Sequence, residues 1–281
     1  MTSHLVTTPD GTTIAADYLE GNDELILFLH GFTGRGSDWD AIVPAVRGER
    51  SALVVDLVGH GDSDHPDRLQ PYEIPSVVDQ VLSLLTNRDI GTVHLVGYSM
   101  GGRIALSMAA RAPWFFASVT LISSSPGLAE PADREARRAS DEALADRIEL
   151  EGVDSFLDGW FALPLFDSLV RALGETGVRE EKQKRAMADP AGLANSLRGS
   201  GTGSMPPLWQ ALSSIRSPVL CLVGELDPKF EAVAERMMSE LPAGELRRIP
   251  QAGHSLLLEA PAELSIAIRR FHGDTSGRMK P

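Results

Sequence analysis

The sequence has little cysteine, little positive charge and no long apolar run. A single cysteine, Cys221, among 281 residues cannot form an internal disulfide. No apolar run approaches the roughly 18 residues that a membrane-spanning helix needs, and the opening residues MTSHLVTTPDGTT have no apolar core of signal-peptide length. Lys and Arg number 26 against 39 Asp and Glu, a net charge of −13, so the chain has no general attraction for nucleic acid or anionic membranes. We therefore expect a soluble cytoplasmic protein with no nucleic-acid partner and no membrane insertion.

The length and a hydrophobic content of 43% are typical of one large domain, or of one domain that carries an insert. Helical patterns alternate with apolar runs typical of strands buried on both faces; the runs are ELILFLH, SALVVDL, VHLVG, ASVTLISS and PVLCLVGE. This alternation predicts an α/β fold with a mostly parallel central sheet flanked by helices. Residues 126–215 contain no strand-like run and predict an inserted helical cap, so residues 1–125 and 216–272 form the core. Residues 273–281 are expected to form a disordered tail.

A serine stands between glycines directly after the run VHLVG. The stretch Gly97-Tyr98-Ser99-Met100-Gly101 fits the G-x-S-x-G pattern and leads into an amphipathic helical pattern. Glycines at its two ends remove Cβ atoms that would clash in a tight strand-to-helix turn. Such a turn lifts the serine hydroxyl above the sheet. The pattern therefore predicts a nucleophile elbow with Ser99 as the catalytic serine.

A catalytic serine needs a base, and the base needs an acid that orients it. When the elbow lies on an α/β sheet, the chain order is Ser, then Asp or Glu, then His. Asp227 follows the run VLCLVGEL, and His254 follows the last strand-like run in RIPQAGHS. Both lie at carboxyl ends of expected strands, where loops of an α/β sheet build sites. Asp227 is the predicted acid, and Glu225, two residues earlier, stays an alternative.

The loop FLHGFTGRG leaves the first central strand. Its Phe32 amide can lie opposite the Met100 amide at the elbow, so we expect these two groups to form an oxyanion hole. Arg103 lies four residues after Ser99, one helical turn further on, where it can reach the cleft or remain on the surface. A simple esterase has little use for a cation there, whereas a carboxylated substrate needs one. HGFTGRGS lacks the Gly-Lys-Ser/Thr of a phosphate loop and no metal cluster occurs, so we expect no cofactor and no metal.

These features together resemble the α/β-hydrolase fold over nearly the whole chain, from LFLHGF through VVDLVGHGDSD and GYSMGG to AGH. Within that fold, GYSMGGR, VGELDPKF and SLRGSGTGSMPPLW are similar to the 2-succinyl-6-hydroxy-2,4-cyclohexadiene-1-carboxylate synthase family of menaquinone biosynthesis. The residues that match the family's signature are Tyr98, Ser99, Arg103, Asp227, Lys229 and Phe230. Two positions depart from it: Met205, near which a glutamine is expected, and Ser125, where some members have histidine.

The resemblance also implies which side chains bind the substrate. It assigns this role to Tyr98, Arg103, Arg137, Trp160 and Arg185. Arg134 and Arg138 lie close to Arg137, and Lys184 adjoins Arg185, so these neighbours remain alternatives within the cap. Three arginines around one pocket would suit a small-molecule tricarboxylate, because guanidinium groups bind carboxylates in a bidentate way.

By the same resemblance the chain is expected to be a carbon–oxygen lyase. The reaction is elimination of pyruvate from 2-succinyl-5-enolpyruvyl-6-hydroxy-3-cyclohexene-1-carboxylate, with the Ser-His-Asp triad as base and the oxyanion hole holding an enolate. The alternative is a serine hydrolase of the same fold, either a carboxylesterase or a C–C bond hydrolase. A binding module on a hydrolase-like scaffold is a third interpretation. The sequence leaves the oligomeric state open.

Overall fold

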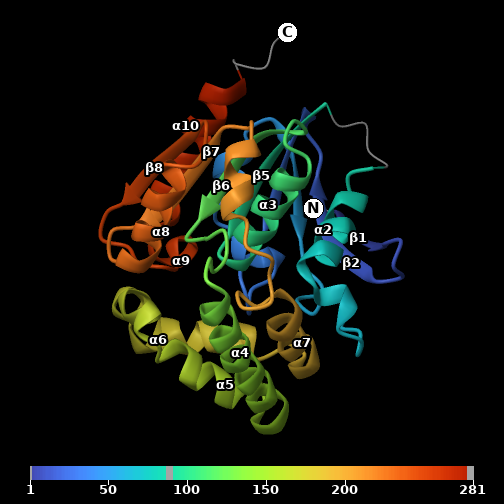
Figure 1. Ribbon diagram of the computed structural model, residues 1–281, viewed down its shortest axis with the longest axis vertical. Helices are drawn as coiled ribbons and strands as arrows, with labels where there is room; N and C mark the ends of the chain where they lie inside the picture. The colour runs from blue at the N-terminus through green and yellow to red at the C-terminus, as the bar shows by residue number, and fades with distance from the viewer. Residues whose placement is uncertain (1, 87–90, 277–281) are drawn as a thin grey trace.

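A single mixed sheet forms the centre of the molecule (Figure 1). The computed structural model describes residues 2–86 and 91–276, and within them eight strands follow the order β1-β2-β4-β3-β5-β6-β7-β8. β1 pairs antiparallel with β2, β2 pairs antiparallel with β4, and the other neighbouring strands are parallel. The predicted α/β fold with a mostly parallel sheet is confirmed. The strands are β1 (Thr2–Thr7), β2 (Thr13–Leu19), β3 (Asn22–Leu29), β4 (Arg50–Val55), β5 (Thr92–Tyr98), β6 (Phe116–Ile122), β7 (Val219–Gly224) and β8 (Gly244–Ile249).

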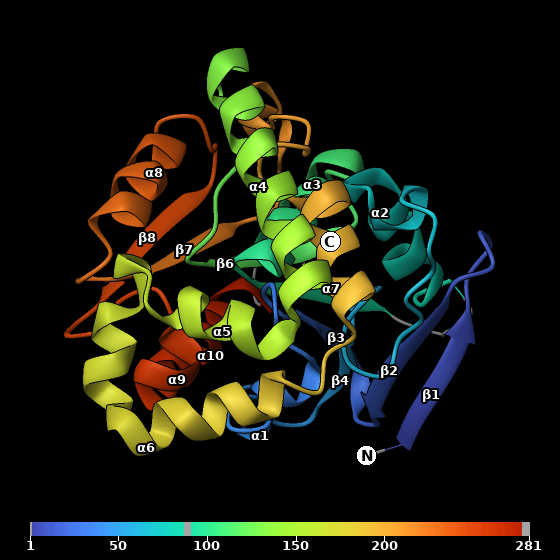
Figure 2. The same ribbon diagram turned by 90° about the horizontal axis from the view of Figure 1, so that it is seen from below.

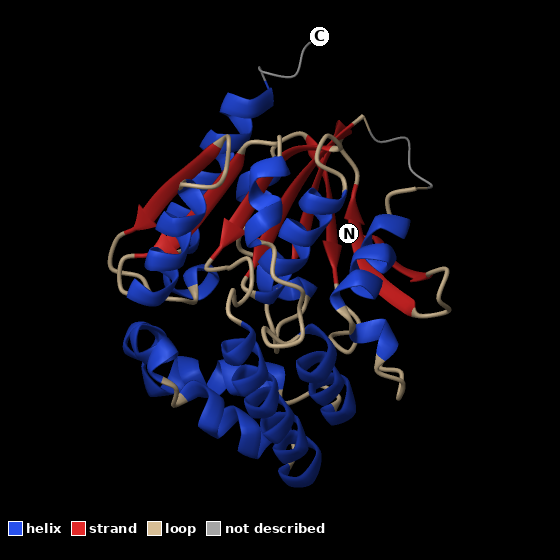
Figure 3. Cartoon of the chain, viewed as in Figure 1, coloured by secondary structure: helices blue, strands red, loops and turns tan. Residues whose placement is uncertain are grey.

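Helices cover both faces of this sheet (Figure 3). Successive side chains of a strand point to opposite faces, so Leu95 and Val96 of β5 belong to two different apolar clusters. Both are fully buried, which is why the central strands appear as continuous apolar runs in the sequence. One cluster includes residues of α2 (Ile74–Ser83), α3 (Met100–Arg111) and α8 (Pro228–Met238). The other includes residues of α1 (Val43–Arg47), α9 (Leu256–Glu259) and α10 (Pro261–Ser276).

Between the end of β6 and the start of β7 the chain forms helices and loops only. The long helices are α4 (Pro131–Glu151), α5 (Val153–Phe161), α6 (Asp167–Arg185) and α7 (Pro190–Ser200), here called the cap helices. They lie together beyond one end of the parallel strands, and Figure 2 shows them across that end of the sheet. They have an apolar cluster of their own, which includes Phe156, Leu157, Leu169, Leu193 and Leu197. The pocket described below lies between these helices and the sheet.

Short 3-10 helices complete the fold, and the boundaries of two other segments differ from those expected from the sequence. The 3-10 helices are η1 (Gly36–Trp39), η2 (Gln70–Tyr72), η3 (Pro164–Phe166) and η4 (Trp209–Ser214). Met205, Leu212 and Ile215 pack in the α3 side of the core, so residues 201–215 cover the sheet as well as closing the insert. α10 continues to Ser276, past residue 273 where the disordered tail was expected to begin. Residues 277–281 lie outside the described residues.

Candidate active site

Ser99 occupies a strained turn between β5 and α3. Its φ of 50° and ψ of −105° are unusual for a residue with a side chain. A Cβ at Gly97 would overlap the backbone of Gly101, and a Cβ at Gly101 would overlap the Leu29 carbonyl. The Ser99 amide donates to the carbonyl of Ile122 at 2.8 Å, which ties the turn to the neighbouring strand. The two glycines of the motif are therefore required by close backbone packing, as the elbow prediction expected.

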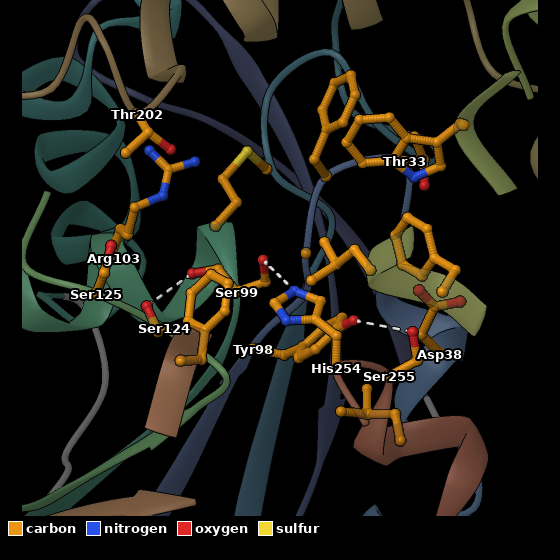
Figure 4. Close-up of a pocket in the computed structure, with 18 of the residues that line it drawn as sticks. Thr33, Asp38, Tyr98, Ser99, Arg103, Ser124, Ser125, Thr202, His254 and Ser255 are labelled. Atoms are coloured by element: carbon orange, nitrogen blue, oxygen red, sulfur yellow. Dashed lines mark hydrogen bonds between the residues drawn. The ribbon is translucent and has the colours of Figure 1, made fainter. Parts of the chain in front are cut away.

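His254 lies between Ser99 and Asp227, and Figure 4 shows its contact with Ser99. Its Nδ1 lies 2.9 Å from Asp227 Oδ2, and its Nε2 lies 3.3 Å from Ser99 Oγ. A carboxylate can only accept, so Nδ1 donates to Asp227 and Nε2 is left to accept the serine proton. Asp227 is buried and also accepts from the Phe230 amide at 3.2 Å, at the start of α8. The structure brings these three side chains together as an acid, a base and a hydroxyl.

The alternative acid Glu225 lies apart from the imidazole. It is exposed and accepts a hydrogen bond from the Gln251 amide at 3.1 Å. Its carboxylate thus caps the loop before His254 instead of orienting the ring. Of the two acids that the sequence left open, Asp227 is the one beside His254.

Phe32 and Met100 both line the pocket that contains Ser99. Phe32 belongs to a tight turn in which the Gly34 amide donates to the Gly31 carbonyl at 3.0 Å. Met100 is the first residue of α3, and the first amides of a helix have no partner within the helix. Thus the two amides expected to form an oxyanion hole both belong to segments that line the pocket.

Aromatic rings from the core and the cap form the apolar wall of the pocket. The ring of Trp160 lies 5.5 Å from that of Phe32 and 5.6 Å from that of Phe166, measured between centroids. The Phe230 ring lies 4.6 Å from the imidazole of His254. These rings shield the triad from water, which strengthens electrostatic interactions inside the pocket.

Tyr98 supports the base from the side of the sheet. Its hydroxyl donates to Ser255 Oγ at 3.4 Å, and its ring centroid lies 5.7 Å from that of His254. Burial raises the pKa of the Tyr98 hydroxyl, so the group stays neutral at physiological pH. Tyr98 lines the pocket, as the resemblance implied, and Figure 4 shows it beside the triad.

Arg103 brings a buried positive charge into the pocket. Its side chain donates to the Ser200 carbonyl at 2.5 Å and approaches Met205 Sδ at 3.7 Å. Among residues 2–86 and 91–276, no carboxylate lies within ion-pair distance of its guanidinium. Burial and the nearby charge of Arg137 lower the pKa of Arg103 to about 10. The residue is thus a charged, incompletely partnered donor that lines the same pocket as Ser99.

Arg137 is the one of the three neighbouring α4 arginines that lines the pocket. Its Nε donates to the buried carboxylate of Asp141 at 2.7 Å. Arg134 donates to two backbone carbonyls at the start of α4, and Arg138 pairs with Glu135 on the surface. The choice of Arg137 therefore agrees with its position.

Arg185 lines the pocket from the end of α6 and is 12% exposed. It forms an ion pair with Glu181, one helical turn earlier, and its Nη2 lies 3.7 Å from Asp38 Oδ2. Lys184 also pairs with Glu181, but its side chain is 67% exposed. The arginine, not the lysine, faces the cavity.

The family model for the alpha/beta hydrolase family matches residues 26–267. A relative from Bacillus subtilis (strain 168), provisionally named 2-succinyl-6-hydroxy-2,4-cyclohexadiene-1-carboxylate synthase, is 35% identical over 95% of this chain and 97% of its own length. A relative with the same name from Serratia proteamaculans (strain 568) is 32% identical over 90% of this chain and 94% of its own. The chain belongs to this synthase family of α/β hydrolases. Among solved structures, MenH from S. aureus superposes with a TM-score of 0.86 at 30% identity, over 93% of this chain and 98% of that one.

A thermophilic esterase from Thermogutta terrifontis superposes with a TM-score of 0.82 at 24% identity, over 98% of this chain and 99% of that one. At this identity the likeness shows the fold alone. Shape by itself therefore does not separate the synthase family from esterases, and the side chains of the pocket must do so.

Several residues in and around the pocket were given no role from the sequence of this synthase-family chain. Asp38 lies in the pocket wall, and Ser124 donates to the Ser99 carbonyl at 2.8 Å. Glu181 fixes Arg185, and Phe230, which matched the family's signature without an assigned role, packs on His254. Only for Glu181 was a local cue available, because a carboxylate four residues before an arginine on a helix favours an ion pair.

Proposed function

We propose that this protein eliminates pyruvate from 2-succinyl-5-enolpyruvyl-6-hydroxy-3-cyclohexene-1-carboxylate, giving 2-succinyl-6-hydroxy-2,4-cyclohexadiene-1-carboxylate in menaquinone biosynthesis. The observation that carries this proposal is the buried Arg103 guanidinium, which lines the same pocket as Ser99 and His254 and has no carboxylate within ion-pair distance among the described residues. A buried charge is costly unless a partner compensates it, so a ligand carboxylate is the natural partner. The names of the two synthase relatives support the same reaction.

In this proposal Ser99 and His254 act together as a base. His254 Nε2 takes the hydroxyl proton of Ser99 as the serine oxygen removes a proton from the substrate. That proton lies on the ring carbon beside the succinyl ketone, where its loss gives an enolate. Asp227 keeps the imidazole in the required tautomer and stabilises its positive charge. The serine forms no covalent bond to the substrate.

The enolate oxygen would lie between the amides of Phe32 and Met100. One such donor typically contributes about 3 kcal/mol to the transition state of a related reaction. When the ketone re-forms, the electron pair makes a new ring double bond, the existing double bond shifts by one position, and the carbon–oxygen bond to the enolpyruvyl group breaks. The leaving enolpyruvate gains the proton from His254 and becomes pyruvate.

The cationic residues would hold the carboxylates of the tricarboxylate substrate. Arg137 lies close enough to lower the pKa of Arg103, so the two guanidinium groups together suit one end of the substrate. Arg185 lies with the aromatic wall, and Tyr98 and Trp160 would flank the ring during proton removal. A dry apolar wall would protect the carbanion from protonation by water.

Arg103→Ala distinguishes the lyase from a serine hydrolase. We expect at least about a hundredfold loss of kcat/KM for the tricarboxylate, because charge-assisted hydrogen bonds to a buried arginine are lost. Cleavage of a small neutral ester such as 4-nitrophenyl acetate, if the wild type has any, should stay nearly unchanged. Arg134→Ala is the matched control, since that arginine serves the start of α4 outside the pocket. Equal losses on both substrates would remove the proposed carboxylate role and favour the hydrolase.

A further inference from the structure

Asp38 places a negative charge beside one of the arginines proposed to bind substrate. It belongs to η1, which follows the loop of Phe32, and it lines the pocket from the core side. Its side chain is 19% exposed, and Figure 4 shows it among the residues that line the cavity. Its Oδ2 lies 3.7 Å from Arg185 Nη2, which belongs to the cap. A core carboxylate and a cap guanidinium therefore meet across the pocket.

Arg185 does not depend on Asp38 for its position. Its Nη1 pairs with the carboxylate of Glu181 and lies 3.3 Å from the Glu181 carbonyl oxygen, both on its own helix. Its Nη2 faces Asp38 at a distance beyond a hydrogen bond. The Asp38 carboxylate thus occupies the region beside Nη2 in which a substrate carboxylate would bind.

The two cationic ends of the pocket differ in their balance of charge. Arg137 forms an ion pair with Asp141, whereas Arg103 has no carboxylate within ion-pair distance among the described residues. Arg185 faces two carboxylates, that of Asp38 and that of Glu181, which also pairs with Lys184. A carboxylate that binds at Nη2 of Arg185 meets the charge of Asp38, whereas the carboxylate near Arg103, that of Asp141, is held in an ion pair by Arg137.

From these contacts we propose that Asp38 is a specificity-determining residue that weakens the binding of a carboxylate at the Arg185 end of the pocket. The inference rests on the proposed function, in which Arg185 binds substrate. Asp38 competes with the incoming carboxylate for Nη2, so the enzyme holds its substrate mainly through Arg103 and Arg137. The Arg185 end consequently releases its carboxylate easily after the reaction.

The test measures binding of an inert tricarboxylate, propane-1,2,3-tricarboxylate, by titration calorimetry at constant ionic strength. We expect Asp38→Asn to tighten its Kd by at least about tenfold, because one repulsive charge within a few ångströms is removed. The amide oxygen of asparagine can still accept from the Arg35 amide, as Asp38 does at 3.4 Å, so the turn is retained. The KM for the tricarboxylate substrate should fall in parallel.

Asp62→Asn is the matched control for net charge. Asp62 pairs with Arg35 at 3.4 Å, has a side chain that is 72% exposed, and lies outside this pocket. It should change the Kd by less than about twofold, because exposed charges are screened. In an Arg185→Met background, Asp38→Asn should have much less effect, a dependence that a purely structural role would not produce.

Unchanged or weaker binding in Asp38→Asn, or no binding to either protein, overturns the role of Asp38. Equal tightening by Asp62→Asn also overturns it, since only the overall field would then matter. Failure of the proposed function has a different signature: the wild type releases no pyruvate, although tricarboxylate binding responds to Asp38→Asn as expected. The calorimetric and catalytic readouts therefore separate the two proposals.

Discussion

Arg103→Met should make the protein more stable while it removes most of the activity. Burial and Arg137 lower the pKa of Arg103 from 12.5 to about 10. At about 1.4 kcal/mol for each pKa unit, the charged side chain costs the folded state roughly 3 kcal/mol. Because pH 7 lies below both pKa values, this cost is fully present under physiological conditions. Methionine fills a similar space without charge, and the lost hydrogen bond to the Ser200 carbonyl offsets about 1 kcal/mol.

The expected net effect is a free energy of unfolding that rises by about 2 kcal/mol, or a Tm higher by roughly 4 °C for a chain of this size. In the pyruvate-release assay, kcat/KM should fall at least about a hundredfold. Calorimetric melting and urea titration measure the first effect, with Arg134→Met as the control that gains no stability. A less stable Arg103→Met protein would refute the argument that this charge lacks a partner. A stabilised but fully active variant would refute its role in binding carboxylate.

Three further changes test other parts of the site. Asp227→Asn should lower kcat by about 10⁴-fold, as loss of the orienting acid does in serine triads, whereas Glu225→Gln should leave kcat unchanged. Comparable losses of kcat for the two variants in steady-state assays would mean that both acids orient the base. Gly101→Ala should lower the free energy of unfolding by about 1–3 kcal/mol and abolish turnover, because the alanine Cβ would overlap the Leu29 carbonyl. Urea titration and steady-state kinetics measure the two effects, and a stable, active variant would contradict the prediction. Burial lowers the pKa of His94 to about 4, below its ordinary 6.5. The folded state therefore binds fewer protons at His94 than the unfolded state, and it loses stability as the pH falls from 6.5 to 4. Urea titrations at both pH values should show a smaller loss for His94→Asn than for the wild type.

The arrangement of the candidate triad was predictable because each of its residues follows a local pattern. Gly97 and Gly101 mark the elbow since close backbone contacts exclude any side chain at both positions. Asp227 and His254 each follow a strand-like run, and the ends of parallel strands meet at one edge of a sheet. Motif spacing and strand order were thus enough to predict that Ser99, Asp227 and His254 lie close together.

The cap was harder to derive because a helical period does not say which face is inward. Arg134 and Arg138 lie one turn apart on α4, and Arg137 and Asp141 lie together on another part of its surface. Periodicity separates these two pairs, but only the family resemblance selected Arg137, which lines the pocket. The segment SGTGSMPPLW has neither a strand nor a helix period, so the packing of Met205 against the core had no local signal.

Asp38 could not be assigned because its significance depends on a residue from the far end of the cap. Its contact with Arg185 joins a core turn to a cap helix, and no spacing rule links them. Within its own turn Asp38 has a structural role, because its carboxylate accepts from the Arg35 amide and packs against Gly34. Its electrostatic effect on the pocket becomes visible only when both ends of the cavity are compared.

We propose that this fold, with the triad typical of a hydrolase, catalyses an elimination. The most direct test generates the enolpyruvyl succinyl-cyclohexene carboxylate in place from isochorismate and 2-oxoglutarate with the preceding pathway enzyme, then follows pyruvate and diene absorbance together. We predict that both products form in equal amounts, well above the spontaneous rate, and that Ser99→Ala abolishes the acceleration. A wild-type rate equal to the spontaneous one, or full acceleration in Ser99→Ala, would contradict the account.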